Sequence, residues 1–243
     1  MGVFMSRAEI IRCYLVERYR TRRFIPLALL LASAGMLAAP GTERLGTVAA
    51  FGSGLRACFV AYIVVLALRV WDDLEDRERD ALAHPDRITV RAEAATPLRH
   101  LAWASVAATT VLIATGDEPL ARLLVFALVG AALGIWYRVR TSLAPSPVLT
   151  AHVVLIKYPV IAYLVAPGAV HGASGLTLAA PVLVAVYLLL CIHEGLDDPE
   201  LRRSRAARGV LVAESALMLP LLGLVIASML DLHLIFFGRG SNP

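Results

Sequence analysis

Cysteine is scarce in this chain, and the few cysteines present form no recognisable motif. Cys13, Cys58 and Cys191 lie far apart, without the close pairs that zinc sites and redox motifs use. Two of them fall in long apolar segments, where a free cysteine behaves as a small hydrophobic residue. The sequence therefore predicts three free thiols with no role in metal binding.

Charge is scarce too, since only 17% of the residues are charged, 58% are hydrophobic and the mean hydropathy is +0.71. An ordinary soluble domain has about 45–50% apolar residues. The apolar residues here form long blocks that approach the ~20 residues needed to cross a bilayer. The short alternating segments of a membrane barrel are missing from the sequence. The blocks are therefore expected to be helices, which satisfy their own backbone polar groups in lipid.

The expected fold class is all-α, a polytopic transmembrane helical bundle of about seven helices. The expected spans are residues 24–40, 46–71, 98–115, 120–137, 147–166, 176–194 and 208–230. Three regions follow from this division: an amphipathic cytoplasmic segment 1–23, a bundle domain 24–237 with cytoplasmic acidic loops, and a C-terminal tail 238–243. No internal repeat stands out, which weighs against a transporter built from matching halves.

The net charge of +4 does not indicate nucleic acid as a partner, because the basic residues are sorted by membrane side. Eighteen of the 23 Lys and Arg residues fall in segments expected to face inwards, and three fall in segments expected to face outwards. This asymmetry predicts a multi-pass protein with a cytoplasmic N-terminus and an outer C-terminus. The high Arg-to-Lys ratio and abundant Ala suggest a bacterium, and thus an inner or plasma membrane. Residues 7–23 alternate apolar pairs with arginines, which predicts an amphipathic helix on the inner surface. A disordered basic tail is the alternative.

Acidic residues gather at two places, each after an even-numbered span. The first group is Asp72, Asp73, Asp76 and Asp80, and the second group is Glu194, Asp197 and Asp198. On a continuing helix Asp72, Asp76 and Asp80 fall within an arc of about 80°, where their charges repel. Mg²⁺ offsets such repulsion and typically combines one or two carboxylates with phosphate oxygens. The pattern predicts a Mg²⁺–diphosphate site, and the alternative is a solvated segment in which Arg77 and Arg79 pair with their acidic neighbours.

The run Asp72-Asp73-x-x-Asp76-x-x-x-Asp80 resembles the first aspartate-rich motif of the UbiA superfamily of membrane prenyltransferases, which also follows helix 2. The segment His84-Pro85-Asp86-Arg87 is similar to the family's short segment with Pro and Arg beyond that motif. Tyr137 ends helix 4, where the family often has a tyrosine, and Lys157 lies in helix 5, where the family tends to carry a basic residue. The second acidic group follows helix 6, where the family's second motif belongs.

The resemblance implies a bundle around an apolar chamber, with Mg²⁺ holding the diphosphate of an isoprenoid and the prenyl group passing to an acceptor. The metal ligands that it implies are Asp72, Asp73, Asp76, Asp80, Glu194, Asp197 and Asp198. The catalytic residues that it implies are Lys157, Arg87 and Tyr137, and the substrate-binding residues are Arg87, Lys157, Tyr158 and Arg138. Metal ions and cationic side chains of this kind neutralise a leaving diphosphate. The expected partners are thus an isoprenyl diphosphate, an acceptor and the lipid bilayer.

Two features depart from the family pattern. Glu194 and Asp198 match the first two positions of the second motif, but Arg202 occupies the third, and Pro199 interrupts a continuous helix. Asp198 can equally be the N-cap of a helix that starts at Pro199. The family usually has about nine helices, so either two helices are absent here or a partner subunit or second copy completes the bundle.

Lys157 lies near the middle of its expected span, where a charge is expensive and by default marks a functional site. A structural pair with Glu214 of the last span is the alternative. The leading functional hypothesis is a Mg²⁺-dependent prenyltransferase. A UbiA-type terpene cyclase and a non-enzymatic membrane protein that retains the bundle are the two competing hypotheses.

Overall fold

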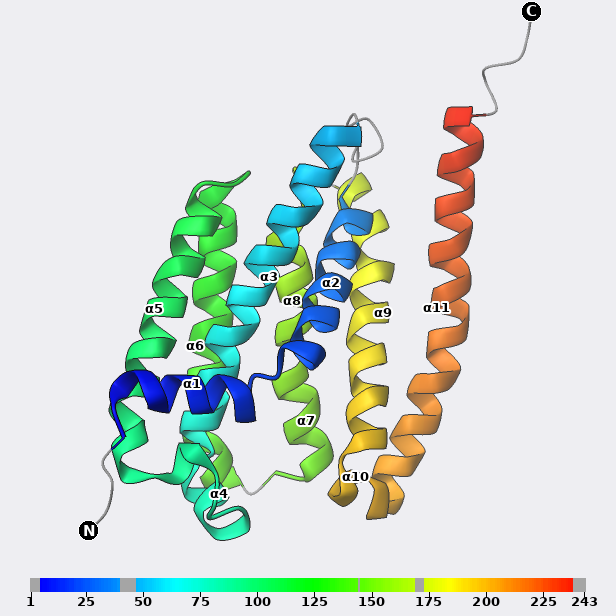
Figure 1. The fold of residues 1–243 in the computed structure, drawn as a ribbon. Helices are drawn as coiled ribbons and strands as arrows, with labels where there is room; N and C mark the ends of the chain where they lie inside the picture. Colours follow the sequence, from blue (N-terminus) through cyan, green and yellow to red (C-terminus); the bar gives the residue numbers. More distant parts are fainter. Residues whose placement is uncertain (1–4, 40–46, 144, 169–172, 238–243) are drawn as a thin grey trace, which may run out of the picture.

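The computed structural model describes residues 5–39, 47–143, 145–168 and 173–237 of the chain, so the predicted tail 238–243 lies outside the described residues. Within these ranges the chain is mainly helical and contains no strand. The long helices stand side by side as a bundle (Figure 1). The all-α polytopic fold that the hydropathy pattern predicts is therefore confirmed.

Six helices in the described part of the chain are long and apolar enough to cross a membrane, which is compatible with a multi-pass membrane protein. Five of them lie in the long helices α2 (Thr21–Ala38), α3 (Thr47–Glu75), α6 (Pro119–Leu143), α9 (Ala173–Asp197) and α11 (Arg205–Phe237), and the sixth covers Pro147–Val165. A further long helix is α5 (Ala95–Ala114). The predicted span 98–115 is a helix, α5, but α5 is not among the six. Arg99, His100 and several Ser and Thr residues lower its hydropathy.

The predicted span 147–166 is divided into α7 (Pro147–Leu155) and α8 (Lys157–Val165), with the break at Ile156. Pro159 explains the break, because proline has no N–H for the carbonyl four residues earlier and its ring crowds that carbonyl. The two pieces together still have the length and hydropathy of a membrane span. As a result Lys157 is the first residue of α8 and not a mid-helix residue.

The N-terminal segment forms α1 (Arg7–Glu17), which confirms a helix in the first part of the predicted range. Ser6 and Glu9 make a capping box: the Ser6 side chain accepts from the Glu9 N–H at 3.3 Å, and the Glu9 carboxylate accepts from the Ser6 N–H at 2.7 Å. Ile10 and Tyr14 are buried. The helix lies across one end of the bundle (Figure 1).

Four short helices gather at the same end of the bundle as α1 (Figure 1). They are α4 (Arg77–Ala83), η2 (Ile88–Val90), η3 (Ala92–Ala94) and α10 (Pro199–Arg203). We call this the charged end, since both predicted acidic groups lie there. A new helix does start at Pro199, directly after Asp198, as the N-cap alternative requires.

The core of the bundle is formed by α2, α3, α8 and α9, with α11 packed along α9 at the edge (Figure 1). The backbones of α2 and α8 approach closely at Gly35. A Cβ atom at Gly35 would be 2.6 Å from the carbonyl oxygen of Ala162 and 3.1 Å from the backbone nitrogen of Ala166. Small residues allow helix backbones to approach in this way inside membranes.

This contact predicts opposite effects for two glycine substitutions. Gly35→Ala places a methyl group against the α8 backbone, and overpacking of this kind costs about 1–3 kcal/mol. Gly54→Ala fills open space, since no heavy atom of the described residues lies within 4 Å of its Cβ position. Alanine is favoured over glycine in a helix by up to about 1 kcal/mol. Thermal unfolding in detergent should therefore show a lower apparent Tm for Gly35→Ala only; equal shifts would contradict the close contact.

Candidate functional site

Asp72 is the centre of a buried polar cluster at the charged end. Its carboxylate accepts hydrogen bonds from the Lys157 ammonium of α8 and from the Tyr137 hydroxyl of α6. Asp72 is 8% exposed and Lys157 is 3% exposed, so the pair is removed from water. The Lys157 ammonium also lies 5.5 Å from the ring centre of Tyr158. Four residues that the sequence predicted for the site are thus brought together on three helices.

Lys157 therefore has a partner inside the bundle, as the structural alternative requires, but the partner is Asp72 and not the suggested Glu214. A buried ammonium needs an opposite charge nearby because desolvation without a partner costs several kcal/mol. Asp72 supplies this charge across the α3–α8 contact. Glu214 lies on α11, where its neighbour is His152 of α7.

Asp73 faces the N-terminal helix and holds it against the bundle. Its carboxylate is 2.6 Å from the Arg18 guanidinium and 3.1 Å from that of Arg69, and it accepts a hydrogen bond from the Tyr14 hydroxyl at 3.0 Å. Burial, together with the negative charge of Asp73, raises the pKa of Tyr14 above its ordinary value. The Tyr14 hydroxyl therefore stays protonated and remains a donor at neutral pH.

The remaining aspartates of the motif continue on the same face across the junction between α3 and α4. We call the row Asp72, Asp73, Asp76 and Asp80 the stripe. The Asp76 N–H donates to the Asp72 carbonyl at 2.9 Å and the Asp80 N–H to the Asp76 carbonyl at 2.8 Å, so the helical hydrogen bonds run on. Asp76 pairs with Arg140 at 2.7 Å, and Asp80 pairs with Arg87 at 2.5 Å. All four aspartates thus have a basic partner.

Many basic partners of the stripe come from distant parts of the chain. Arg77 of the solvated-segment alternative donates to the backbone carbonyls of Val90 and Arg91 at 3.2 and 2.9 Å, which anchors the turn beyond α4. Bases that reach the stripe come from α3, α6, α8 and the segments at residues 18 and 87. The stripe therefore connects distant parts of the chain.

The second acidic group lies at the charged end, on the last turn of α9 and just beyond it. Glu194 is half-buried and lies within electrostatic range of Arg69, the residue that also pairs with Asp73. Asp197 is exposed and Asp198 is half-buried before α10.

A large chamber opens beside the stripe, between α3, α5 and α6. Its volume is about 930 Å³. The side chains of Leu68, Trp103, Val106 and Phe126 are among its apolar lining. Four charged residues lie toward its charged end, namely Glu75, Arg77, Arg99 and Arg138. Arg138 is thus placed at the chamber, whereas Arg87 and Lys157 lie at the stripe.

Trp71 lies between the chamber and the buried Asp72 cluster. Its indole lines the chamber, stacks edge-on against Tyr137 at 5.7 Å between ring centres, and donates to Glu75 at 3.0 Å. Gly134 of α6 lies beside the indole, and a Cβ there would be at an ordinary contact distance of 3.5 Å. Trp71 thus contacts both the chamber and Tyr137 of the Asp72 cluster.

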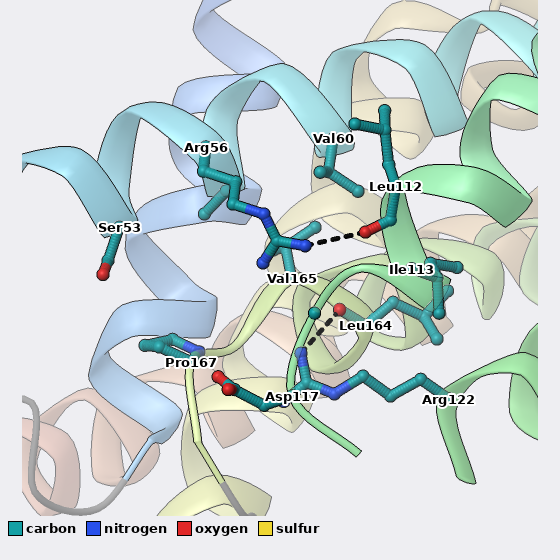
Figure 2. A pocket seen from close by; sticks show the side chains of 12 residues that line it. Ser53, Arg56, Val60, Leu112, Ile113, Asp117, Arg122, Leu164, Val165 and Pro167 are labelled. Carbon is teal, nitrogen blue, oxygen red and sulfur yellow. Dashed lines mark hydrogen bonds between the residues drawn. The ribbon is translucent and has the colours of Figure 1, made fainter. Parts of the chain in front are cut away.

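The opposite end of the bundle holds a small cavity of about 60 Å³ with two arginines in its wall (Figure 2). Arg56 donates to the Leu112 carbonyl at 2.7 Å, near the end of α5. Arg122 donates to the carbonyls of Leu164 and Gly168 at 3.0 and 2.7 Å, at the end of α8. Cations at helix C-termini satisfy free carbonyls and the helix dipole. We interpret these arginines as helix caps.

No family model, curated protein or solved structure matches this chain. A functional assignment therefore depends on the geometry of the charged end and on the resemblance of the aspartate-rich motif.

Four partners of the stripe were not anticipated from the sequence: Tyr14, Arg18, Arg69 and Arg140. Arg69 stands four residues before Asp73, a spacing at which helical side chains meet, so its role was open to inference. Arg140 lies one turn beyond Tyr137, and its guanidinium carbon is 4.8 Å from that ring centre. The partners from the N-terminal segment carry no such signal, because they are 59 and 55 positions from Asp73.

The three partners of Asp73 predict that it controls the docking of α1. Asp73→Asn removes the charge that holds Arg18 and Arg69, at a cost of about 1–3 kcal/mol. Trypsin cleavage after Arg12 should then accelerate roughly 5- to 150-fold, if opening and closing are fast relative to cleavage. Glu78→Gln, an exposed acidic position of the next helix, is the matched control. Unchanged cleavage in Asp73→Asn would show that α1 is held by its apolar contacts alone.

Proposed function

We propose that this chain is a Mg²⁺-dependent integral membrane prenyltransferase of the UbiA type. It would ionise an isoprenyl diphosphate and transfer the prenyl group to an aromatic or other acceptor. The main support for the proposal is the stripe, in which each aspartate pairs with a basic side chain, beside an apolar chamber. We place the enzyme in a bacterial inner or plasma membrane with its N-terminus in the cytoplasm, and a partner subunit or second copy is a further part of the proposal.

The charges of the stripe are complementary to a Mg²⁺–diphosphate complex. Such a complex carries both signs, so the aspartates can turn to the metal while Lys157 and Arg140 turn to the phosphates, and no buried charge is left alone. Mg²⁺ supplies neutralisation of the leaving diphosphate when it is bound.

The donor set at the stripe fits that metal. Carboxylate oxygens are the ligands that Mg²⁺ prefers. One oxygen of Asp80, Oδ2, is buried and has no hydrogen-bond partner among the described residues. The Asp76 side chain is 33% exposed and thus open to an incoming complex. We assign metal binding to the stripe first, and to Glu194, Asp197 and Asp198 second.

The chamber is suited to the prenyl chain. Its volume lies in the range of about 300–1,000 Å³ that is typical of small-molecule sites. Arg99 and Thr110 both line it, and the eleven steps along α5 from one to the other correspond to about 16 Å of helix. Glu75 lines the chamber and Asp76 follows it in the stripe, so the diphosphate would bind where these two regions meet. The ring of Trp71, which lines the chamber, would stabilise an allylic cation there.

The ion pairs also favour a second candidate, a non-enzymatic bundle protein. In that case the pairs serve only to join α1, α3, α6 and α8, and the stripe binds no metal. The two candidates differ at Asp76, whose exposed position makes it the least needed for packing.

Diphosphate release is the direct test of the enzymatic proposal. The purified protein in detergent should release diphosphate from geranyl, farnesyl or geranylgeranyl diphosphate when Mg²⁺ is present and not when EDTA is added. Asp76→Asn should lower this rate about 10²- to 10³-fold, the usual effect of removing one electrostatic contact to a developing charge. Glu78→Gln, the exposed control on α4, should retain the wild-type rate.

The products separate the remaining hypotheses. Prenylated acceptor identifies a transferase, and a cyclised hydrocarbon formed without acceptor identifies a terpene cyclase. No Mg²⁺-dependent release from any of the three substrates, with or without aromatic acceptors, would reject the enzyme and favour the structural bundle.

If the chamber holds the prenyl chain, a bulky side chain inside it should raise the KM for long substrates more than for short ones. Gly130→Phe places a ring in the chamber, where a Cβ meets no heavy atom of the described residues within 4 Å. The KM for geranylgeranyl diphosphate should rise about tenfold or more, the usual effect of excluding methylene groups from a pocket. The KM for geranyl diphosphate should change little. Gly52→Phe is the control, since Gly52 has equally open surroundings away from the chamber. Equal effects of Gly130→Phe on both substrates would show that the prenyl group binds outside the chamber.

A further inference from the structure

A second polar cluster lies on the other side of the bundle, where α7, α9 and α11 meet. His152, Cys191 and Glu214 line a cavity of about 20 Å³ there. A cavity of about 10–15 Å³ already accommodates one water molecule, so this space is sufficient for a single water or ion. None of the three residues takes part in the aspartate stripe.

The three side chains offer one ligand atom each, and these atoms lie within 4.8 Å of one another. His152 Nε2 is 3.5 Å from Glu214 Oε1, while the Cys191 sulfur lies beside the other ring nitrogen, 3.4 Å from Nδ1. In a tetrahedral zinc site the ligand atoms stand about 3.5 Å apart, given Zn–N near 2.0 Å and Zn–S near 2.3 Å. Since no two ligand atoms are more than 4.8 Å apart, they need to approach one another by about 1.3 Å at most.

We propose that His152, Cys191 and Glu214 form a binding site for a divalent d-block metal ion, with Zn²⁺ as the simplest occupant. Imidazole and thiolate favour such metals, whereas Mg²⁺ and Ca²⁺ favour oxygen ligands alone. A thiolate and a carboxylate together balance two positive charges, so the complete site is neutral inside an apolar bundle. A neutral complex avoids the cost of a buried unpaired charge.

The state of Glu214 is an independent observation for this site. Glu214 is 7% exposed, and its Oε1 is buried without a hydrogen-bond partner among the described residues. Oε1 is also the oxygen nearest to His152. A buried carboxylate oxygen without a hydrogen-bond partner among the described residues is well suited to bind a cation.

Tyr187 orients the histidine. Its hydroxyl is 2.9 Å from His152 Nδ1 and donates to the His152 carbonyl at 3.4 Å. Metal-binding histidines usually have their second ring nitrogen held in this way. The arrangement leaves Nε2, the nitrogen beside Glu214, for the metal, and a fourth position for water.

Metal binding can be measured on the purified full-length protein, independently of any prenyl chemistry. After removal of metals with a chelator, Co²⁺ is titrated and followed by the absorption of its thiolate bond, then displaced with Zn²⁺. We expect one Co²⁺ per chain, released by Zn²⁺. Cys191→Ser should abolish the thiolate absorption, and Glu214→Gln and His152→Ala should each weaken binding at least about tenfold. Tyr187→Phe should weaken binding about 10- to 100-fold, as loss of an outer hydrogen bond does.

Cys13→Ser and Cys58→Ser are the matched controls, because these thiols lie outside the cluster. Both should bind Co²⁺ as the wild type does. A folded wild-type protein that binds neither Co²⁺ nor Zn²⁺ overturns the proposal and leaves a His152–Glu214 ion pair. Binding that persists in both Cys191→Ser and Glu214→Gln also overturns it. Since His152→Ala can disturb packing, Cys191→Ser and Glu214→Gln are the decisive variants, with folding checked by size-exclusion elution.

Discussion

The ion pair between Asp72 and Lys157 is the interaction on which the rest of the charged end depends. Both groups are buried in an apolar bundle, where neither charge is tolerated alone. Their pairing joins α3 to α8, and the Tyr137 hydroxyl adds α6 to the same carboxylate. The same requirement acts along the motif, because Asp73 attracts the N-terminal helix and Asp76 attracts the end of α6. The acidic stripe is therefore the junction of four separate parts of the chain.

This junction has a chemical consequence as well as a structural one. A site in which each carboxylate already has a base is nearly neutral, and it is best matched by a ligand that carries both signs. The proposed Mg²⁺–diphosphate complex has this property, and the neighbouring chamber offers room for an apolar chain. The cluster at Glu214 presents the opposite situation, because its buried oxygen lacks a full partner. The thiol and the imidazole beside the carboxylate distinguish the inferred metal site from the stripe, whose aspartates pair with Lys and Arg.

Much of the bundle could be anticipated because the bilayer allows few solutions. Long apolar blocks must become helices, and the i, i+4 spacing of Asp72, Asp76 and Asp80 was enough to place them on one stripe. The helix at the N-terminus was also expected from its alternating arginines. The interruption at Ile156 was missed, although Pro159 is its local cause and stands in the sequence. That interruption matters because it makes Lys157 the start of a helix.

The sequence by itself determined which segments are helical, where the charges gather and which aspartates share a face, because these properties depend on neighbours within a few turns. Only the tertiary structure decided which base each acid meets. Asp73 pairs with a residue 55 positions away and Asp72 with one 85 positions away. The cluster of His152, Cys191 and Glu214 likewise unites residues of three helices. Such pairings depend on how the helices pack, and no local pattern in the sequence records the angle or the register at which two helices meet.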